Sequence, residues 1–537
     1  MTEDSTLDSI TLEIMRNQLE SIAEEMGQVL ITSAYSPNIK ERQDCSTALF
    51  DADGRLVAQA EHIPVHLGAM PASVAAVIEH DPQPGDVFVL NDPFEGGTHL
   101  PDITMVSPLV CESEIIGYAA SRAHHADIGG GTPGSMPAGT REIYDEGIRV
   151  PPVTLKRDGE VTPVLQVLLA NVRNPSERQA DIRAQLAANE RGETRITELV
   201  DDYDRKTVLD AFDAVIQYSR DRMTTAIDAL PDGTYAAENA LEGDGISEKD
   251  IPIEVTVSID GTAVDVDFTG TAEQVAGNMN APPAVARSAV YFSLRCVTDP
   301  EIPPNQGCYD PITITVPDGS LLNPDPPAAV VGGNVETSQR VTDVVFDACA
   351  EAVPECVPAQ SQGTMNNLTI GSREGDEKGF TYYETIGGGF GARPDKDGMD
   401  GVQVGMTNTL NTPIESLELE YPLRVACYAL RPNSGGNGQY RGGLGIERQV
   451  TVEVDATVSL LTERRRSAPN GTAGGLDGAP GKNLLDGDPI PAKTTRDVSP
   501  GTTVTVLTPG GGGYGDPEER AQKTIDLDRK DGKMNAD

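Results

Sequence analysis

The chain is long and strongly acidic. Its 537 residues are enough for several domain-sized cores. It carries 84 Asp and Glu against 41 Lys and Arg, a formal net charge of −43. This excess argues against nucleic acids and anionic membranes as partners, because both are bound mainly through Lys and Arg that neutralise phosphates. At 38% hydrophobic residues the chain can still bury cores, so the acidity predicts the solvated surface of a halophilic globular protein rather than disorder.

The cysteines and the N-terminus indicate a reducing compartment. Seven cysteines are widely spaced and form no C-x-x-C pair, which disfavours a disulfide framework or a zinc ribbon. The N-terminus, MTEDSTLDSI, is acidic where a signal peptide would be basic. No apolar run approaches the ~20 residues that span a bilayer. We therefore expect a soluble, cytoplasmic protein with reduced thiols.

The first 160 residues are predicted to form a mixed α/β domain. Apolar residues recur every three or four positions between residues 11 and 33, the pattern of a helix with one buried stripe. The segment CSTALFDADGRLVAQ predicts two strands around an Asp-Gly turn. A short helix and three β-rich runs are expected further on, at residues 71–80, 86–90, 103–110 and 115–123.

Three further regions follow, and together they predict a mixed α and β (α+β) fold. Residues 161–232 should be a helical connecting region, with a break at Asn174-Pro175. Residues 233–520 should be a larger β-rich domain with Gly-rich loops, since several segments alternate apolar and polar residues. Residues 521–537 are predicted to be a polar C-terminal tail.

Three of the six histidines fall in two short loops, GGTHLPD and RAHHADIGG. Imidazole and carboxylate groups at strand ends can converge on a divalent ion at about 2.0 to 2.2 Å. His99 and Asp102 form a first pair. If the strand before the second loop continues through residue 123, His124 faces one side, while His125 and Asp127 face the other. The alternative is that these are structural loop histidines, with both aspartates capping turns.

Two other histidines have a spacing that is typical of a helical zinc pair. His62 and His66 are four residues apart, but Pro64 disfavours a helix between them. In an extended chain they would lie about 13 Å apart, too far to share one ion.

No ATP-binding loop is recognisable. The segment TPGGGGYG contains a formal G-x-G-x-x-G after a predicted strand. A dinucleotide-binding unit would continue with a helix, a second strand and an acid about 20 residues on, which the remaining chain does not provide. The phosphate loop G-x-x-x-x-G-K-[ST] and the G-x-S-x-G nucleophile turn are both missing from the sequence.

Three segments combine many glycines with arginine: GGGFGARPDKDG, GGNGQYRGGLG and ERRRSAPNGTAGG. Glycine permits close backbone approach and exposes N–H groups to anionic or carbonyl groups. Arg393 in the first segment and Arg465 in the third are therefore candidate substrate-binding residues. The alternative is that these segments are tight turns between short strands.

These motifs, in this order, resemble those of the hydantoinase B family, which includes N-methylhydantoinase B subunits, the C-terminal half of 5-oxoprolinase and the large subunit of acetone carboxylase. The segments that carry the resemblance run over nearly the whole chain: SPNIKERQDCSTALFDADGRLVAQAEHIPVHLGAM, LNDPFEGGTHLPDI, SRAHHADIGGGTPGS, NMNAPPAVARSAVYFSLR, GGNVETSQR, YYETIGGGFGARPDKDGMDG, NTPIESLELEYPL, RGGLG and TPGGGGYGDP.

The resemblance implies a catalytic subunit in a hetero-oligomer with a hydantoinase A-type partner, an actin-like ATPase that binds ATP and phosphorylates the substrate. ATP would then act only through that partner. It also implies a divalent metal, Mn, Zn or Fe, in this chain. The implied ligands are His99, Asp102 and one of His124 or His125, with Glu41 as a further carboxylate. If His124 is the ligand, His125 and Asp127 remain as the groups that move protons.

The function expected from this resemblance is the hydrolysis of cyclic-amide C–N bonds, as in a hydantoinase or 5-oxoprolinase. One alternative is an acetone-carboxylase-type subunit that acts on a ketone. Another is a non-catalytic scaffold that completes the site of a partner. The metal content of the purified chain separates a scaffold from an enzyme, because a scaffold needs no stoichiometric ion.

Overall fold

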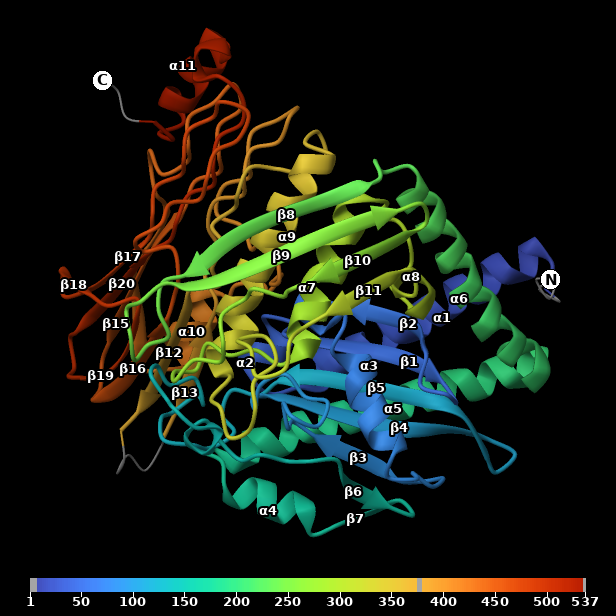
Figure 1. The fold of residues 1–537 in the computed structure, drawn as a ribbon. Helices are drawn as coiled ribbons and strands as arrows, with labels where there is room; N and C mark the ends of the chain where they lie inside the picture. The colour runs from blue at the N-terminus through green and yellow to red at the C-terminus, as the bar shows by residue number, and fades with distance from the viewer. Residues whose placement is uncertain (1–6, 374–378, 535–537) are drawn as a thin grey trace.

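The computed structural model describes residues 7–373 and 379–534 (Figure 1). An antiparallel seven-stranded sheet forms its N-terminal part, in the order β2-β1-β5-β4-β3-β6-β7. The strands are β1 (Cys45–Asp51), β2 (Leu56–Glu61), β3 (Val87–Leu90), β4 (Asp102–Cys111), β5 (Glu114–His124), β6 (Val153–Arg157) and β7 (Glu160–Val161). β1 and β2 form the predicted hairpin, and the three predicted β-rich runs are β3, β4 and β5.

Helices cover both faces of this sheet. On one face α1 (Ser9–Ser33) packs on α5 (Pro175–Tyr203) and α6 (Arg205–Asp228). The apolar stripe predicted for α1 is buried there, at Met15, Leu19, Ile22, Met26 and Leu30. The opposite face packs on the short helix α3 (Met70–Ile78). Side chains along β5 alternate between the two faces of the sheet. Ala119 and Ala123 lie in the core with α1 and α5, while Tyr118 and Ala120 lie in the core on the α3 face.

The predicted helical region is broken twice. Asn174 has a left-handed φ of 53° and Pro175 begins α5, so the expected break after α4 (Val164–Ala170) is confirmed. A second break at Asp204 separates α5 from α6, with φ 78°. No Gly or Pro marks this position, but the Asp204 carboxylate accepts the N–H of Thr207 at 2.9 Å. Asp204 therefore caps the N-terminus of α6, a role that its residue type permits but does not require.

A second sheet, β11-β10-β9-β8, covers two central helices. Its strands are β8 (Gly233–Leu241), β9 (Ile251–Asp260), β10 (Ala263–Asp267) and β11 (Ile312–Thr315). The helices are α7 (Pro283–Val297) and α9 (Ser338–Ala352), and a π-helix over Gly333–Thr337 leads directly into α9. One hydrophobic cluster joins these elements to the N-terminal sheet. This core therefore contains residues from both sides of the domain boundaries predicted at residues 160 and 232. Those boundaries stay a prediction.

The C-terminal part, orange and red in Figure 1, holds two packed sheets. One has the order β13-β12-β16-β19 and the other β14-β15-β20-β17-β18. The first contains β12 (Asn367–Ser372), β13 (Thr381–Glu384), β16 (Ala456–Leu461) and β19 (Lys493–Val498). The second contains β14 (Leu423–Leu430), β15 (Ile446–Val452), β17 (Lys482–Leu485), β18 (Asp488–Ile490) and β20 (Thr503–Leu507). Apolar residues of β12 and β16 meet those of β15 and β20 between the sheets.

The Gly-rich segments pack against one another. The N–H of Gly511 donates to the carbonyl of Gly443 at 2.9 Å, and the N–H of Gly443 donates to that of Phe390 at 2.8 Å. A Cβ added at Gly511 would lie 2.2 Å from the Phe390 carbonyl oxygen, and one at Gly442 would lie 1.9 Å from that of Gly511. The glycines thus allow the backbones of these segments to pack directly on one another. This packing accounts for the glycines of the formal G-x-G-x-x-G motif, with no role in nucleotide binding.

Residues 522–530 of the predicted tail form α11 (Gln522–Lys530). Asp528 anchors this helix through an ion pair with Arg520 at 2.6 Å. The remaining short helices are α2 (Pro37–Lys40), α8 (Gln306–Tyr309) and α10 (Ile414–Glu420). Within residues 7–373 and 379–534, no helix combines the length and the apolar character of a membrane span.

Candidate metal centre

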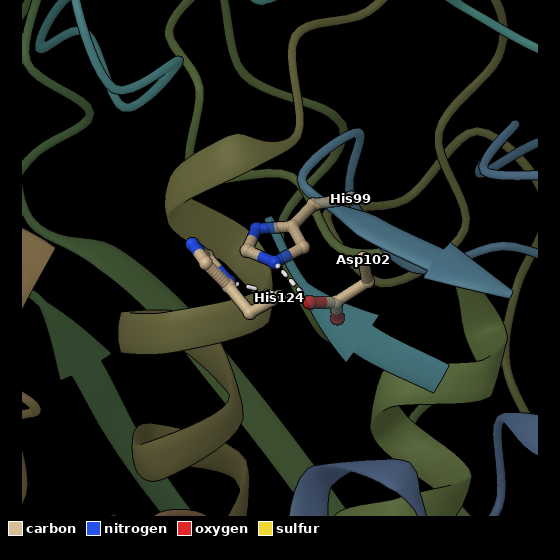
Figure 2. Close-up of side chains that lie close together, drawn as sticks. All are labelled: His99, Asp102 and His124. Atoms are coloured by element: carbon tan, nitrogen blue, oxygen red, sulfur yellow. Dashed lines mark ion pairs between the residues drawn. The ribbon is translucent and has the colours of Figure 1, made fainter. Parts of the chain in front are cut away.

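The register of two strands brings the two histidine loops together. Asp102 begins β4 and lies opposite His124, the last residue of β5, in the antiparallel pair. His99 is held nearby because the N–H of Asp102 donates to its carbonyl at 3.1 Å. His99 Nε2 lies 3.0 Å from Asp102 Oδ1, and His124 Nδ1 lies 3.3 Å from the same oxygen (Figure 2). The structure therefore places His99, Asp102 and His124 at one point.

This cluster fits a divalent metal ion. One ligand atom from each residue lies within 4.8 Å of the others, and the side chains are at most 3% exposed. His99 Nε2 is buried without a hydrogen-bond partner. His99 Nδ1 lies 3.4 Å from the carbonyl oxygen of Val331, and a proton on Nδ1 would leave the Nε2 lone pair free for an ion. Two imidazoles with one carboxylate suit Zn, Mn or Fe.

The charge of Asp102 agrees with this role. Burial would raise its pKa, but the surrounding histidines, His99 first, hold the pKa well below its ordinary value. The carboxyl group is therefore ionised, as a ligand must be. Arg122 is buried on the face of β5 that also carries His124, and it donates to Thr104 at 2.8 Å. Burial lowers the pKa of Arg122 to about 10, and the negative charge of Asp102 opposes that lowering.

The structure also brings His66 to the cluster, although the sequence did not predict it there. His66 Nε2 lies 3.6 Å from Asp102 Oδ2, and its Nδ1 lies 2.9 Å from Ser46 Oγ. Pro64–His66 forms a single 3-10 turn, which is neither an α-helix nor an extended chain. His62 lies elsewhere, with its ring beside Gly27 of α1.

A stacked tyrosine holds the plane of the His124 ring. Tyr383 of β13 lies 4.6 Å from it between ring centroids, with an interplanar angle of 11°. The guanidinium of Arg42 lies 5.1 Å from the Tyr383 ring centroid and donates to the Tyr383 carbonyl at 2.7 Å. In the segment NIKER it is therefore Arg42 that reaches the surroundings of the cluster. Glu41 ends α2 and is not among the grouped ligands.

His125 and Asp127 make their hydrogen bonds away from the cluster, so the geometry does not favour the proton-transfer roles expected of them. His125 Nε2 lies 2.9 Å from Gln185 Oε1 of α5. Burial lowers the pKa of His125 to about 4, so it is neutral near pH 7. Asp127 accepts the N–H groups of Gly129, Gly134 and Arg173 at 2.9 to 3.0 Å, and pairs with the Arg173 guanidinium at 3.0 Å. It caps a loop, as the alternative interpretation of the sequence stated.

The two candidate substrate-binding arginines also lie away from the histidines. All three guanidinium nitrogens of Arg465 donate within the chain, to Asn483, Asn366 and the Glu463 carbonyl. The Arg465 side chain thus stabilises the fold rather than facing a substrate. Arg393 lies 5.4 Å from the Phe390 ring centroid and lines a cavity of about 260 Å³ between α7, α9 and the loop 356–363, which the cluster histidines do not line.

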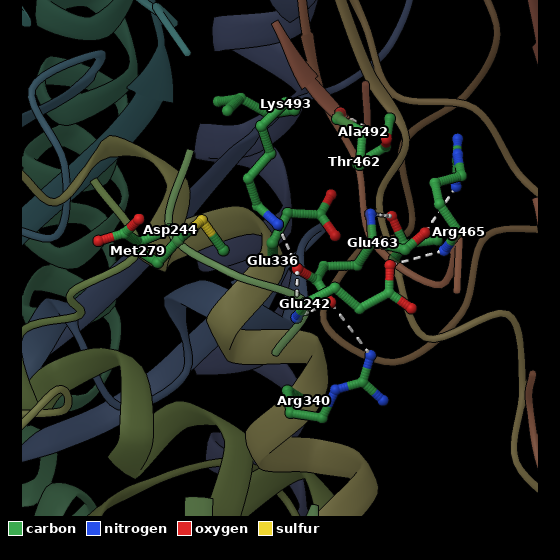
Figure 3. A network of polar contacts seen from close by, with 12 residues as sticks. Glu242, Asp244, Met279, Glu336, Arg340, Thr462, Glu463, Arg465, Ala492 and Lys493 are labelled. Carbon is green, nitrogen blue, oxygen red and sulfur yellow. Dashed lines mark hydrogen bonds and ion pairs between the residues drawn. The ribbon is translucent and has the colours of Figure 1, made fainter. Parts of the chain in front are cut away.

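A buried network of charged side chains around Glu336 and Glu463 was not predicted (Figure 3). It reaches the His124 ring through Asn367 and Tyr383. Glu336 lies in the π-helix, and its Oε1 accepts the Met365 N–H at 3.1 Å and Asn367 Nδ2 at 2.8 Å, while Oε2 is buried without a partner. Asn367 also accepts the Tyr383 hydroxyl at 2.8 Å. Burial, reinforced by the negative charge of Glu463, raises the pKa of Glu336 to about 8. In the sequence, Glu336 lies in GGNVETSQR, one of the segments that carry the family resemblance.

The sequence matches the hydantoinase B/oxoprolinase family over residues 8–517, and the chain belongs to that family. It is 42% identical to an uncharacterised protein of Methanocaldococcus jannaschii, over 98% of this chain and 94% of that protein. It is 40% identical to 5-oxoprolinase 1 of Arabidopsis thaliana, over 95% of this chain and 42% of the plant protein. The chain thus spans less than half of the plant relative. The family resemblance inferred from the motifs is confirmed.

Two solved structures share the fold. The crystal structure of ATP-dependent caprolactamase from Pseudomonas jessenii superposes with a TM-score of 0.91 at 29% identity, over 99% of this chain and 95% of that chain. The nucleotide-free structure of acetone carboxylase gives a TM-score of 0.90 at 20% identity, over 100% of this chain and 79% of that chain. This second likeness shows the fold alone. The predicted mixed α and β class is confirmed.

Proposed function

We propose that this chain is the metal-dependent catalytic part of an ATP-dependent enzyme that hydrolyses the C–N bond of a cyclic amide. The observation that carries the proposal is the buried convergence of His99 Nε2, Asp102 Oδ1 and His124 Nδ1. The names of the relatives support the reaction class, since they include 5-oxoprolinase 1 of Arabidopsis thaliana and the ATP-dependent caprolactamase.

The residues of the cluster divide the work. His99, Asp102 and His124 would hold the ion, which supplies Lewis-acid polarisation of a carbonyl oxygen or lowers the pKa of bound water. Tyr383 fixes the orientation of the His124 ring by stacking. His66 Nε2, beside Asp102 Oδ2 and oriented by Ser46, is the atom best placed to hold or move a proton. We assign this role to His66 in place of His125 and Asp127.

ATP would be used by a separate hydantoinase A-type subunit. Two observations support this division. The sequence contains no G-x-x-x-x-G-K-[ST] loop, and a Pseudomonas sp. protein proposed to be one subunit of a D-/L-hydantoinase is 34% identical over 99% of this chain and 94% of its own length. In the longer 5-oxoprolinase of Arabidopsis thaliana, this chain corresponds to 42% of the polypeptide, which leaves room there for an ATPase part.

The decisive experiment measures metal content and turnover together. The chain is co-purified with its A-type partner, and Mn, Zn and Fe are quantified by mass spectrometry. Release of product is assayed with ATP and 5-oxoproline, N-methylhydantoin or caprolactam, and separately with acetone and bicarbonate. We expect about one ion per chain and cyclic-amide hydrolysis. His99→Ala should lose both, while His80→Ala, at an exposed histidine, should keep both.

Three other outcomes would contradict the proposal. Full metal content and full activity in His99→Ala would remove the assigned site. A chain without metal, in an active complex, would be a scaffold. ATP-dependent consumption of acetone and bicarbonate, without hydrolysis of any cyclic amide, would instead place the chain with the carboxylases.

A further inference from the structure

The two oxygens of Asp102 face different surroundings. Oδ1 faces His99 Nε2 and His124 Nδ1. Oδ2 accepts the hydroxyl of Thr98 at 2.8 Å and Nδ2 of Asn334 at 3.2 Å, and His66 Nε2 lies 3.6 Å from it. All of these side chains are buried. Oδ1 thus faces His99 and His124, whereas Oδ2 accepts hydrogen bonds on the other side of the carboxylate.

We propose that Thr98 and Asn334 are positioning residues that hold Asp102 so that it offers only Oδ1 to the ion. The inference rests on the proposed metal function. A carboxylate can bind a metal through one oxygen or through both, and rotation about its Cβ–Cγ bond interconverts the two modes. Two donors on Oδ2 oppose that rotation. Hydrogen bonds of this kind orient a ligand and strengthen the site.

Thr98 is close to Asp102 in sequence, since it lies four residues before it. Asn334 comes from 232 residues further along the chain, so its position depends on how the π-helix is anchored. The N–H groups of Gly332 and Gly333 both donate to the carbonyl of Asn278, at 2.9 and 3.1 Å. The Thr337 hydroxyl donates to the carbonyl of Met279 at 2.5 Å.

Close packing adds to this anchoring. A Cβ at Gly333 would lie 1.9 Å from the Asn280 carbonyl oxygen, so only glycine allows the π-helix to sit against residues 278–280. A π-helix is rare and is frequently found at functional sites. Here it presents Asn334 to Asp102 and Glu336 to Asn367 from one five-residue segment. The amide of Asn334 must donate through Nδ2, because an ionised Asp102 can only accept.

The experiment titrates the metal-free chain with Mn²⁺ by calorimetry and records the electron paramagnetic resonance spectrum of bound Mn²⁺. Thr98→Val keeps the shape of the side chain and removes the donor, whereas Thr98→Ser keeps the donor. Asn334→Ala removes the second donor. Ser293→Ala is the matched control, because the buried Ser293 hydroxyl donates within α7, to the carbonyl of Ala289 at 2.8 Å, rather than to the π-helix.

We expect Thr98→Val and Asn334→Ala each to weaken Mn²⁺ binding by about 10- to 100-fold and to change the spectrum, because Asp102 can then rotate. Thr98→Ser and Ser293→Ala should bind as the wild type does. Circular dichroism of the metal-free variants identifies any that fail to fold. If Asn334→Ala is among them, the Thr98→Val and Thr98→Ser pair decides the question.

The results also separate this inference from the proposed function. If Thr98→Val and Asn334→Ala bind Mn²⁺ with wild-type affinity and an unchanged spectrum, while His99→Ala loses the ion, the positioning role is wrong and the metal site stands. If the wild-type chain binds no Mn²⁺, Zn²⁺ or Fe²⁺, the proposed metal function is wrong and the positioning role falls with it.

Discussion

The buried carboxyl of Glu336 should make the stability of this protein depend on pH, and Glu336→Gln should remove that dependence. Glutamine is a close mimic of the protonated acid. Its Oε1 can keep the hydrogen bonds from the Met365 N–H and Asn367 Nδ2, at 3.1 and 2.8 Å in the wild type. Its uncharged amide group replaces Oε2, which is buried without a partner.

The pKa of Glu336 sets the size and sign of the effect. Burial and the charge of Glu463 raise this pKa to about 8 from an ordinary 4.5, against the opposing positive charges of Lys493 and Arg465. The folded state therefore holds a proton that the unfolded chain has lost between about pH 4.5 and 8. Stability from this group is fully present below pH 4.5, decreases as the pH rises, and is lost by about pH 8.

Each pH unit within this window corresponds to about 1.4 kcal/mol. Relative to the wild type, Glu336→Gln should therefore gain roughly 3 kcal/mol by pH 7 and roughly 4 kcal/mol by pH 8, and below about 1 kcal/mol at pH 5. The assay is urea unfolding followed by far-ultraviolet circular dichroism, because the chain contains no Trp for fluorescence. Glu415→Gln, which removes a charge from an exposed position in α10, is the control.

The measured quantity is the difference between variant and wild type at each pH from 5 to 9. A difference that rises with pH and then levels off above pH 8 supports the reasoning. Parallel curves for Glu336→Gln and the wild type would refute it, because they would mean that Glu336 is already ionised in the folded protein at neutral pH.

Three further predictions follow from the site and from the composition. His125→Ala should leave metal binding intact but lower the free energy of unfolding by about 2 kcal/mol, because Gln185 loses a buried partner; loss of the ion in this variant would reverse the assignments of His124 and His125. The isolated chain should show no ATP binding in calorimetry, and tight binding would contradict the separate ATPase subunit. Molar KCl should raise the melting temperature, because a net charge of −43 repels itself over a Debye length of ~30 Å at 0.01 M but only ~3 Å at 1 M; a melting temperature that falls with salt would contradict the halophilic interpretation.

Local patterns predicted many of the secondary-structure elements. The buried stripe of α1, the hairpin of β1 and β2 and the break at Asn174 each depend on neighbours in sequence, so the chain itself carries the signal. The break at Asp204 was missed because an aspartate marks a helix start only when the chain turns there. The alternation along β5 also predicts correctly that His124 and His125 face different surroundings.

The sequence by itself determined the acidic composition, the family and the two histidine loops. Composition, motif order and strand period can all be read from the order of residues, without knowledge of which residues meet in space. Only the tertiary structure decided which groups meet at Asp102. His66 reaches it by a 3-10 turn, Asn334 by a π-helix and Tyr383 through β13, and these positions are up to 317 residues apart in number, from 66 to 383. No periodicity predicts such contacts. They depend on packing between sheets and on backbone hydrogen bonds that exist only in the folded chain.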